Sequence, residues 1–370
     1  MNEIREILQP PKTNVQIIYA GGTISSFATP QGYREGGHFV DLVGRLEEHQ
    51  QGFTKGFDIG EPQTAYTGLS ENIEQADLER METAIDAAIL RNPNSIIMSF
   101  GTDFAEQAGK IFQNKYKERL HQKGMKIVIV SANDDLSHPQ TDAWDNLTFS
   151  FKSAGSGAEP GVYLGFHRRL IPAELTIKEP YNGKEMNFRA IDDPEYVEAV
   201  RVKKESDDKQ IEALKSVMPQ EQETEAVLDY SVSVFRRNHQ ELLDKLKSNP
   251  VKAILLTLYH SGTANANNSE ASVSELVKKL REQGIVVFGA TENGEPVDLH
   301  SYETSVKLRE AGVVPLYDMQ KDVASTKLRL MKRGLSSQEL IKSMLHNVAG
   351  EIDEDRIIEE DFQKLIELYQ

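Results

Sequence analysis

Two short segments place a hydroxyl side chain directly after a glycine turn. In the first, apolar residues from Val15 lead into AGGT at 20–23, and in the second, SIIMSF at 95–100 leads into GTD at 101–103. Glycines let a backbone turn sharply and come close to a ligand. A hydroxyl such as that of Thr23 can be a nucleophile where a base activates it. Taken alone, each segment is equally typical of a structural turn with a capping side chain, and Asp103 of an ordinary helix N-cap.

Three further positions carry chemical groups near such turns. Ser70, Glu71 and Asn72 follow TGL at 67–69, where a helix begins, so each of them can also be a simple cap or favour the positive end of the helix. Tyr33 is the only tyrosine in the Gly-, Ser- and Pro-rich loop 25–39, and loops of this kind often carry function. Lys178 by itself is typical of a solvated surface lysine.

Composition and missing motifs exclude several classes of protein. The net charge of −16 argues against nucleic acid and against anionic membranes as partners. The chain has no cysteine, so thiolate catalysis and cysteine-based metal sites are excluded. No Walker A, His-Glu-x-x-His or Gly-x-Ser-x-Gly motif occurs, and the nine histidines are scattered without a ligand spacing. The segment GSGAEPG at 155–161 fails as a dinucleotide fingerprint, because Pro160 takes the place of the third glycine and a strand follows it.

Apolar strand patterns alternate with helical patterns along the chain. Strands are expected at 15–20, 95–100, 125–130, 161–166, 251–258, 284–289 and 313–316, with helices between them. This alternation predicts an α/β fold: a larger N-terminal domain with a parallel-rich sheet flanked by helices, and a smaller C-terminal α/β domain of flavodoxin-like type. The predicted boundaries are 1–203 for the N-terminal catalytic domain, 204–225 for a polar linker and 226–370 for the C-terminal domain. Ligands of such sheets bind at the carboxyl ends of the strands, where Thr23 is expected.

The two ends of the chain carry their own expectations. The acidic segment 351–370 predicts a helix that is either docked on the C-terminal domain or used in an oligomer contact. No secretory signal and no apolar run of membrane-spanning length is present, so a cytoplasmic location is expected.

Several weak local signals follow one family's order. They are GGTI at 21–24, GY at 32–33, SEN at 70–72, GTD at 101–103, TD…NL at 141–147, Lys178, AN at 264–265 and AGVV…DM…ASTKL at 311–328. This set resembles the bacterial-type L-asparaginase/glutaminase family over about residues 15–332. Similarity to the glutaminase subunit of the archaeal tRNA-dependent amidotransferase is expected to be weaker, because a first strand that begins near residue 15 leaves no room for an added N-terminal domain.

The resemblance implies roles for the residues singled out above. Thr23 matches the nucleophile and Tyr33 the loop tyrosine that hydrogen-bonds it. Thr102, Asp103 and Lys178 match the second threonine, its aspartate and the lysine of the proton relay. Ser70 and Glu71 match the residues that hold the α-carboxylate and α-amino groups of the substrate. The remaining predicted substrate-binding residues are Gly22, Gly101, Ala132, Asn265 and Glu303.

The implied activity is hydrolysis of the side-chain amide of L-asparagine or L-glutamine through a threonine acyl-enzyme, without metal or organic cofactor. In the family a neighbouring subunit supplies the residue that Asn265 matches, so a homo-oligomer, a dimer or tetramer with shared sites, is expected. The small-molecule amide is the expected partner.

The sequence departs from the family pattern around the catalytic positions. Phe100 stands where histidine usually precedes Gly-Thr-Asp, and Phe104 stands where a second threonine commonly follows. Ala20 and SAN at 131–133 also differ from the family. Two alternatives therefore stay open: an amidohydrolase for a larger amide, with Phe100 and Phe104 reshaping the pocket rim, and a non-catalytic amino-acid-binding protein.

Overall fold

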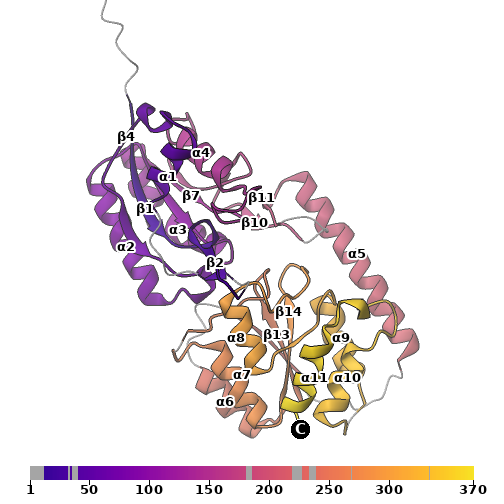
Figure 1. Ribbon diagram of the computed structural model, residues 1–370. Coiled ribbons are helices and arrows are strands. Elements are labelled where there is room, and N and C mark those ends of the chain that lie inside the picture. Colours follow the sequence, from indigo (N-terminus) through magenta and orange to yellow (C-terminus); the bar gives the residue numbers. More distant parts are fainter. Residues whose placement is uncertain are drawn as a thin grey trace, which may run out of the picture.

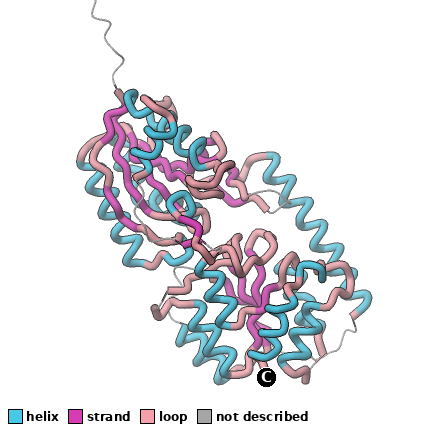
Figure 2. The backbone as a smooth tube through the Cα atoms, in the orientation of Figure 1, coloured by secondary structure: helices cyan, strands magenta, loops and turns pink. Residues whose placement is uncertain are grey.

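Two sheets, one in each half of the chain, organise the structure. The computed structural model describes residues 12–31, 34–35, 41–180, 186–218, 227–232, 239–267, 269–332 and 334–370. Figure 1 shows an N-terminal unit, coloured indigo to magenta, and a C-terminal unit, coloured orange to yellow, that face one another beside the long helix α5 (Pro194–Val217). Figure 2 shows that helices surround the strands of the C-terminal unit.

The sheet of the N-terminal unit is mostly parallel. Its strands follow the order β4 (Phe57–Ile59), β1 (Thr13–Ala20), β6 (Ser95–Phe100), β7 (Lys126–Val130), β8 (Gly161–Phe166) and β9 (Arg169–Pro172), with β5 (Gln63–Tyr66) also on β1. All these pairs are parallel except β8 with β9. Two small antiparallel pairs accompany it: β2 (Phe27–Ala28) with β3 (Arg34–Glu35), and β10 (Thr176–Lys178) with β11 (Phe188–Ala190).

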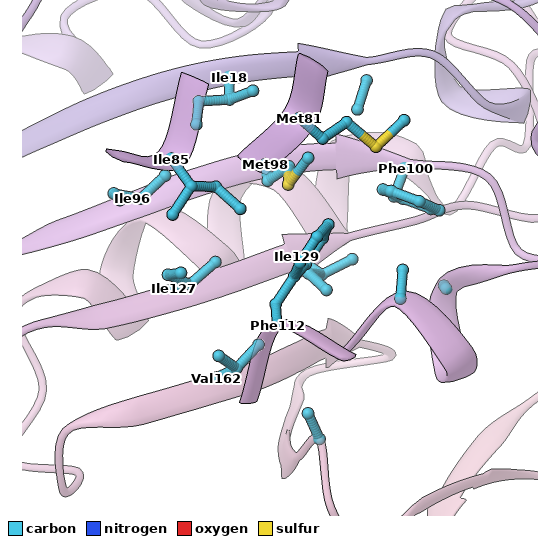
Figure 3. Packing of buried hydrophobic residues seen from close by; sticks show 14 of the residues in the cluster. Ile18, Met81, Ile85, Ile96, Met98, Phe100, Phe112, Ile127, Ile129 and Val162 are labelled. Atoms are coloured by element: carbon cyan, nitrogen blue, oxygen red, sulfur yellow. The ribbon is translucent and has the colours of Figure 1, made fainter. Parts of the chain in front are cut away.

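Helices cover both faces of this sheet, and the alternation along β1 decides which residues face which helices. Ile18 and Ala20 join the core formed with α2 (Gln75–Leu90) and α3 (Ala105–Lys123). Val15, Ile17 and Tyr19 join the core formed with α1 (Leu42–His49) and α4 (Ala143–Ala154). Figure 3 shows part of the first core, with Met81, Ile85 and Phe112 beside Ile18, Met98 and Ile129 of the sheet.

The C-terminal unit repeats the same architecture. Its parallel sheet has the order β12 (Val227–Ser231), β13 (Ala253–Leu258), β14 (Val286–Thr291) and β15 (Val314–Pro315). One core contains residues of α6 (His239–Ser248), α7 (Val273–Glu282) and α8 (Glu303–Ala311). The other contains residues of α9 (Lys321–Leu330), α10 (Ser337–Leu345) and α11 (Glu359–Leu368). The terminal helix is docked, since the Tyr369 hydroxyl donates to the Gly312 carbonyl (2.8 Å).

The α/β prediction is confirmed, while several local expectations change. After the expected strand at 125–130 a loop is predicted from the sequence over 131–146, but the helix α4 already begins at Ala143. The predicted domain boundary at residue 203 falls within α5, so the boundary itself stays a prediction. Among the described residues, no helix has both the length and the apolar character needed to cross a membrane.

The expectation that Phe100 and Phe104 shape a pocket rim is wrong. Both rings are buried in the core between the sheet, α2 and α3, with centroids 6.4 Å apart. Phe100 has the same parity along β6 as Ile96 and Met98, so the pleat of the strand turns its side chain into that core (Figure 3). Phe100 and Phe104 therefore give no support to the alternative of an amidohydrolase for a larger amide.

Candidate active site

Three backbone turns meet at the carboxyl edge of the N-terminal sheet. Strands β1 and β6 pair with Ala20 opposite Phe100, so the glycine turns that follow them leave the sheet side by side. A Cβ atom built on Gly22, whose φ is +90°, would lie 2.2 Å from the Gly101 nitrogen. A Cβ atom on Gly101 would lie 2.3 Å from Ser70 Oγ. Only glycine permits these approaches, and they bring the segments of Thr23, Thr102 and Ser70 into contact.

The two threonines are buried at this junction. Thr23 is 6% exposed and begins the short 3-10 helix η1 (Thr23–Ser25), while Thr102 is 5% exposed in the turn before α3. The Gly22 N–H donates to the Gly68 carbonyl (3.1 Å), which holds the first turn against the segment that leads to Ser70. Predicted neighbours Gly22, Thr23, Ser70, Gly101 and Thr102 are thus brought together.

Asp103 does not cap a helix but forms a buried ion pair. The N-cap of α3 is Phe104, and Asp103 Oδ1 lies 3.2 Å from Nζ of Lys178, the last residue of β10. Their side chains are 6% and 9% exposed. Burial by itself would raise the pKa of Asp103, but the charges of His260 and Lys178 and the hydrogen bonds to the carboxylate outweigh it, so the pKa is held below its usual range. Asp103 is therefore a fixed negative charge at neutral pH.

The loop after β13 of the C-terminal unit reaches the same carboxylate. Thr263 Oγ1 donates to Asp103 Oδ2 (2.5 Å), and His260 Nδ1 is in hydrogen-bond contact with Asp103 Oδ1. The candidate site therefore lies between the two units (Figure 1).

Glu71 is a second buried carboxyl group, within the 3-10 helix η3 (Ser70–Asn72). The capping box of α2 is made by Glu74 and Asp77, so the expectation that Ser70 or Asn72 caps this helix is wrong. Thr304 Oγ1, from α8, donates to Glu71 Oε1 (2.7 Å). Burial, and then the charge of Asp103, raise the pKa of Glu71 to about 8. Glu71 therefore changes charge near neutral pH.

Asn265 meets the N-terminal unit beside Glu71. Its Nδ2 donates to Glu74 Oε1 (3.4 Å), and the Ala266 N–H donates to Asn72 Oδ1 (3.0 Å). Glu71, Glu74 and Asn265 share the lining of one cavity. All these contacts lie within one chain, so a neighbouring subunit that supplies Asn265 stays a prediction.

Two predicted site residues, Glu303 and Ala132, have other surroundings among the described residues. Glu303 pairs with Lys307 on its own helix (2.6 Å), while the adjacent Thr304 faces Glu71. Ala132 is fully buried in the core with α1 and α4. Tyr33 lies outside the described residues. Among the residues that the structure does describe, no group of three or more His, Asp or Glu is placed to hold a metal ion.

Sequence reasoning missed four residues that reach the buried carboxyl groups or lie near them. They are His260, Thr263, Glu295 and Thr304. Burial raises the pKa of Glu295, whose charge also interacts with those of His260 and Lys178. Both of its carboxylate oxygens are buried without a hydrogen-bond partner in the described structure. The only sequence signal was their closeness to Asn265 and Glu303, since the contacts depend on how the two units dock.

The arrangement suits activation of a hydroxyl nucleophile. A neutral hydroxyl needs a base, and Lys178 beside Asp103 can exchange a proton with a neighbouring hydroxyl. Backbone N–H groups at the glycine turns can stabilise negative charge on a carbonyl oxygen. Glu71 offers a carboxylate to a cationic group in the same region.

Comparison with known proteins relates the chain to one protein family. A family model described as asparaginase, N-terminal, matches residues 14–214. The chain is 25% identical over 352 residues to L-asparaginase 1 of Escherichia coli (strain K12), covering 93% of this chain and 99% of that protein. It is 24% identical over 361 residues to a glutamyl-tRNA(Gln) amidotransferase subunit of Pyrococcus abyssi, covering 93% and 78%. These identities are almost equal, so the expected weaker similarity to the amidotransferase is not supported.

Two solved structures align over most of the chain. The thermostable L-asparaginase from Thermococcus kodakarensis aligns over 92% of this chain and 99% of its own, with 21% identity and a TM-score of 0.38. A probable cytoplasmic L-asparaginase from Campylobacter jejuni aligns over 91% and 100%, with 15% identity and a TM-score of 0.43.

Proposed function

The chain belongs to the asparaginase family of amidohydrolases, and on that premise we propose that it hydrolyses the side-chain amide of L-asparagine, or of L-glutamine, to the acid and ammonia. One observation carries the proposal. The Gly22 and Gly101 turns are in backbone contact, which sets Thr23 and Thr102 on adjacent segments beside the buried Asp103–Lys178 pair.

The proposed reaction proceeds through an ester on Thr23. The Thr23 hydroxyl passes its proton toward Thr102 and Lys178 and attacks the amide carbon. The C–N bond then breaks, the relay returns the proton to the leaving nitrogen, and ammonia departs. Water hydrolyses the ester to release the acid. In the proposed complex, Glu71 in its ionised form binds the α-ammonium group of the substrate, and Ser70 binds the α-carboxylate.

An ammonia-release assay over asparagine, glutamine and their larger derivatives tests the substrate. Release from asparagine or glutamine supports the proposal, with asparagine expected to be the better substrate. Release only from a bulkier amide supports the larger-amide alternative, and no release from any amide supports a binding protein.

Variants of the relay test the mechanism. Thr23→Ala should abolish the acyl-enzyme, and quenched wild-type protein should carry the adduct on the peptide that contains Thr23. Thr102→Val should slow turnover severely with little change in substrate binding. The double variant Thr102→Val/Lys178→Met should turn over only slightly more slowly than either single variant, because the effects of groups that act as one unit are non-additive. An adduct on the Thr102 peptide would exchange the roles of the two threonines.

The proposal includes assembly as a homo-oligomer, a dimer or a tetramer, as the family resemblance implies. Cyclic or dihedral symmetry is the common arrangement of soluble homo-oligomers. Light scattering at the assay concentration tests it, and an active monomer would contradict it. The cytoplasmic location expected from the sequence stays a prediction.

A further inference from the structure

His260 lies between the two members of the catalytic ion pair. Its Nδ1 atom is 2.8 Å from Lys178 Nζ and also contacts Asp103 Oδ1, while its Nε2 atom is 3.0 Å from Ser261 Oγ. The side chain is 12% exposed. It comes from the C-terminal unit, whereas Asp103 and Lys178 belong to the N-terminal unit.

The position of one proton decides how these three groups can coexist. If Lys178 donates to a bare Nδ1, the lone pair of that nitrogen also faces the Asp103 carboxylate, and the contact is repulsive. If Nδ1 carries the proton, it donates to the carboxylate, and Lys178 Nζ can still donate one of its hydrogens to Asp103 Oδ1 (3.2 Å). Two full positive charges on nitrogens 2.8 Å apart would repel strongly at a buried site. The arrangement that satisfies these contacts has both the Nδ1–H group of His260 and the Lys178 amine donating to the Asp103 carboxylate.

We infer that His260 is a positioning residue, whose Nδ1–H group donates to Asp103 and so divides the hydrogen bonding of this carboxylate between itself and Lys178, the proposed acceptor of the Thr102 proton. The inference rests on the proposed function, because Thr102 and Lys178 form the relay only in that reaction. Without His260, the Asp103 carboxylate would lose one donor and interact more strongly with Lys178, so the lysine would release a proton less readily than in the wild type.

The other charged and titratable groups around the cluster set the background. Glu106 of α3 accepts the Lys178 backbone N–H (3.2 Å). Glu71 from η3 and Glu295 from the loop after β14 interact electrostatically with Lys178 and with Asp103, and burial raises the pKa of each. Burial, and then the charge of Asp103, raise the pKa of Tyr259 as well. Of Asp103, Glu71 and Glu295, Asp103 is therefore the one whose pKa is held below its usual range.

Kinetics of the full chain separate this role from a purely structural one. In His260→Ala the ascending limb of the kcat–pH profile for asparagine should move up by about one pH unit, which lowers kcat about tenfold below the limb. KM should stay within about threefold, since His260 is not placed on the substrate. His260→Asn keeps a hydrogen-bond donor near the position of Nδ1, so its kcat below the limb should be close to that of the wild type. Ser261→Ala, which touches only Nε2, is the matched control and should follow the wild type.

Two results would overturn the inference in this assay. One is an unmoved limb with kcat and KM impaired together, as expected for a contact that only joins the two units. The other is a His260→Asn variant as impaired as His260→Ala.

A measurement without turnover tests the proton directly. Two-bond ¹H–¹⁵N spectra of the histidine-labelled wild-type protein distinguish the ring nitrogens, and the His260 signals are those missing from His260→Asn. A protonated Nδ1 across pH 6 to 8 is expected, and a ring protonated on Nε2 alone would refute the inference. Because this result does not depend on catalysis, a protein that releases no ammonia would contradict the proposed function while the spectra still decide the state of His260.

Discussion

Ligand binding should release a proton from Glu71. Burial and the nearby Asp103 raise the pKa of the Glu71 carboxyl to about 8, so the empty site holds this group mostly uncharged at pH 6 and 7. The ammonium group of an amino-acid ligand favours the ionised form, because an opposite charge in contact lowers the pKa of a carboxyl. Binding and ionisation are therefore coupled.

The size of the effect follows from that pKa. A carboxyl with a pKa of about 8 is about 1% ionised at pH 6 and about half ionised at pH 8. Affinity for L-asparagine should therefore rise roughly 50-fold between these two pH values, which is about 2.3 kcal/mol. Close to one proton should leave the protein for each ligand bound at pH 6.

Calorimetric titration of the Thr23→Ala protein with L-asparagine measures both quantities, because buffers of different ionisation enthalpy report the released protons. Glu71→Gln in the same background should bind weakly, release no proton and show no pH dependence. Thr304→Val removes the hydroxyl that donates to Glu71 (2.7 Å), so its affinity should begin to rise at higher pH. Equal proton release by the Glu71→Gln protein would refute the assignment of the titration to Glu71.

The same shift predicts the pH dependence of stability without ligand. The folded-state pKa is raised above its ordinary value of 4.5, so the stabilisation is complete below about pH 4.5 and is lost as pH rises through about 8. The melting temperature of the Thr23→Ala protein should fall, relative to that of the Thr23→Ala/Glu71→Gln protein, across this interval. A constant difference would contradict the raised pKa.

Two further predictions concern the turns and the docking of the units. Gly22→Ala should lower the free energy of unfolding by about 3 kcal/mol, from left-handed strain and a clash with the Gly101 backbone. Gly124→Ala, where φ is +66° and no atom lies within 4 Å of the added carbon, should cost only about 1 kcal/mol in the same denaturant titration, and equal losses would contradict the close approach. Mixing and refolding Thr23→Ala with His260→Ala should give no more activity below the pH limb than the His260→Ala protein supplies by itself, because the His260–Asp103 contact forms within one chain; activity with the wild-type pH dependence would mean that the contacts form between subunits.

Local patterns predicted the part of the site that depends on single strands. The segments that end in Thr23 and Thr102 are each a strand followed by a glycine turn, and parallel pairing of β1 with β6 brings them together. The role of Lys178 came only from family resemblance, since nothing near it in the sequence indicates a buried ion pair. Phe100 was misplaced because its motif was considered without the alternation of β6, which turns it inward.

Long-range contacts explain what the sequence did not indicate. His260 meets a carboxylate 157 positions earlier in the chain, and Thr304 meets one 233 positions earlier. Each partner comes from a loop or helix start of the C-terminal unit, where a histidine or threonine has many ordinary uses. The contacts of these side chains become apparent only when the two units are docked, because other histidines and threonines of the chain look the same in the sequence.

The contacts also imply that the charge of the site and the docking of the two units are coupled. Asp103 and Glu71 each receive a hydrogen bond from the C-terminal unit: Asp103 from Thr263 (2.5 Å) and Glu71 from Thr304 (2.7 Å). Separation of the units would remove both donors and return both carboxyl groups to water, where their pKa values would approach ordinary ones. Conditions that ionise Glu71 without a cationic ligand therefore weaken the docked state, and a bound ammonium group strengthens it. A ligand of the proposed chemistry thus stabilises the arrangement that brings His260 to the catalytic ion pair.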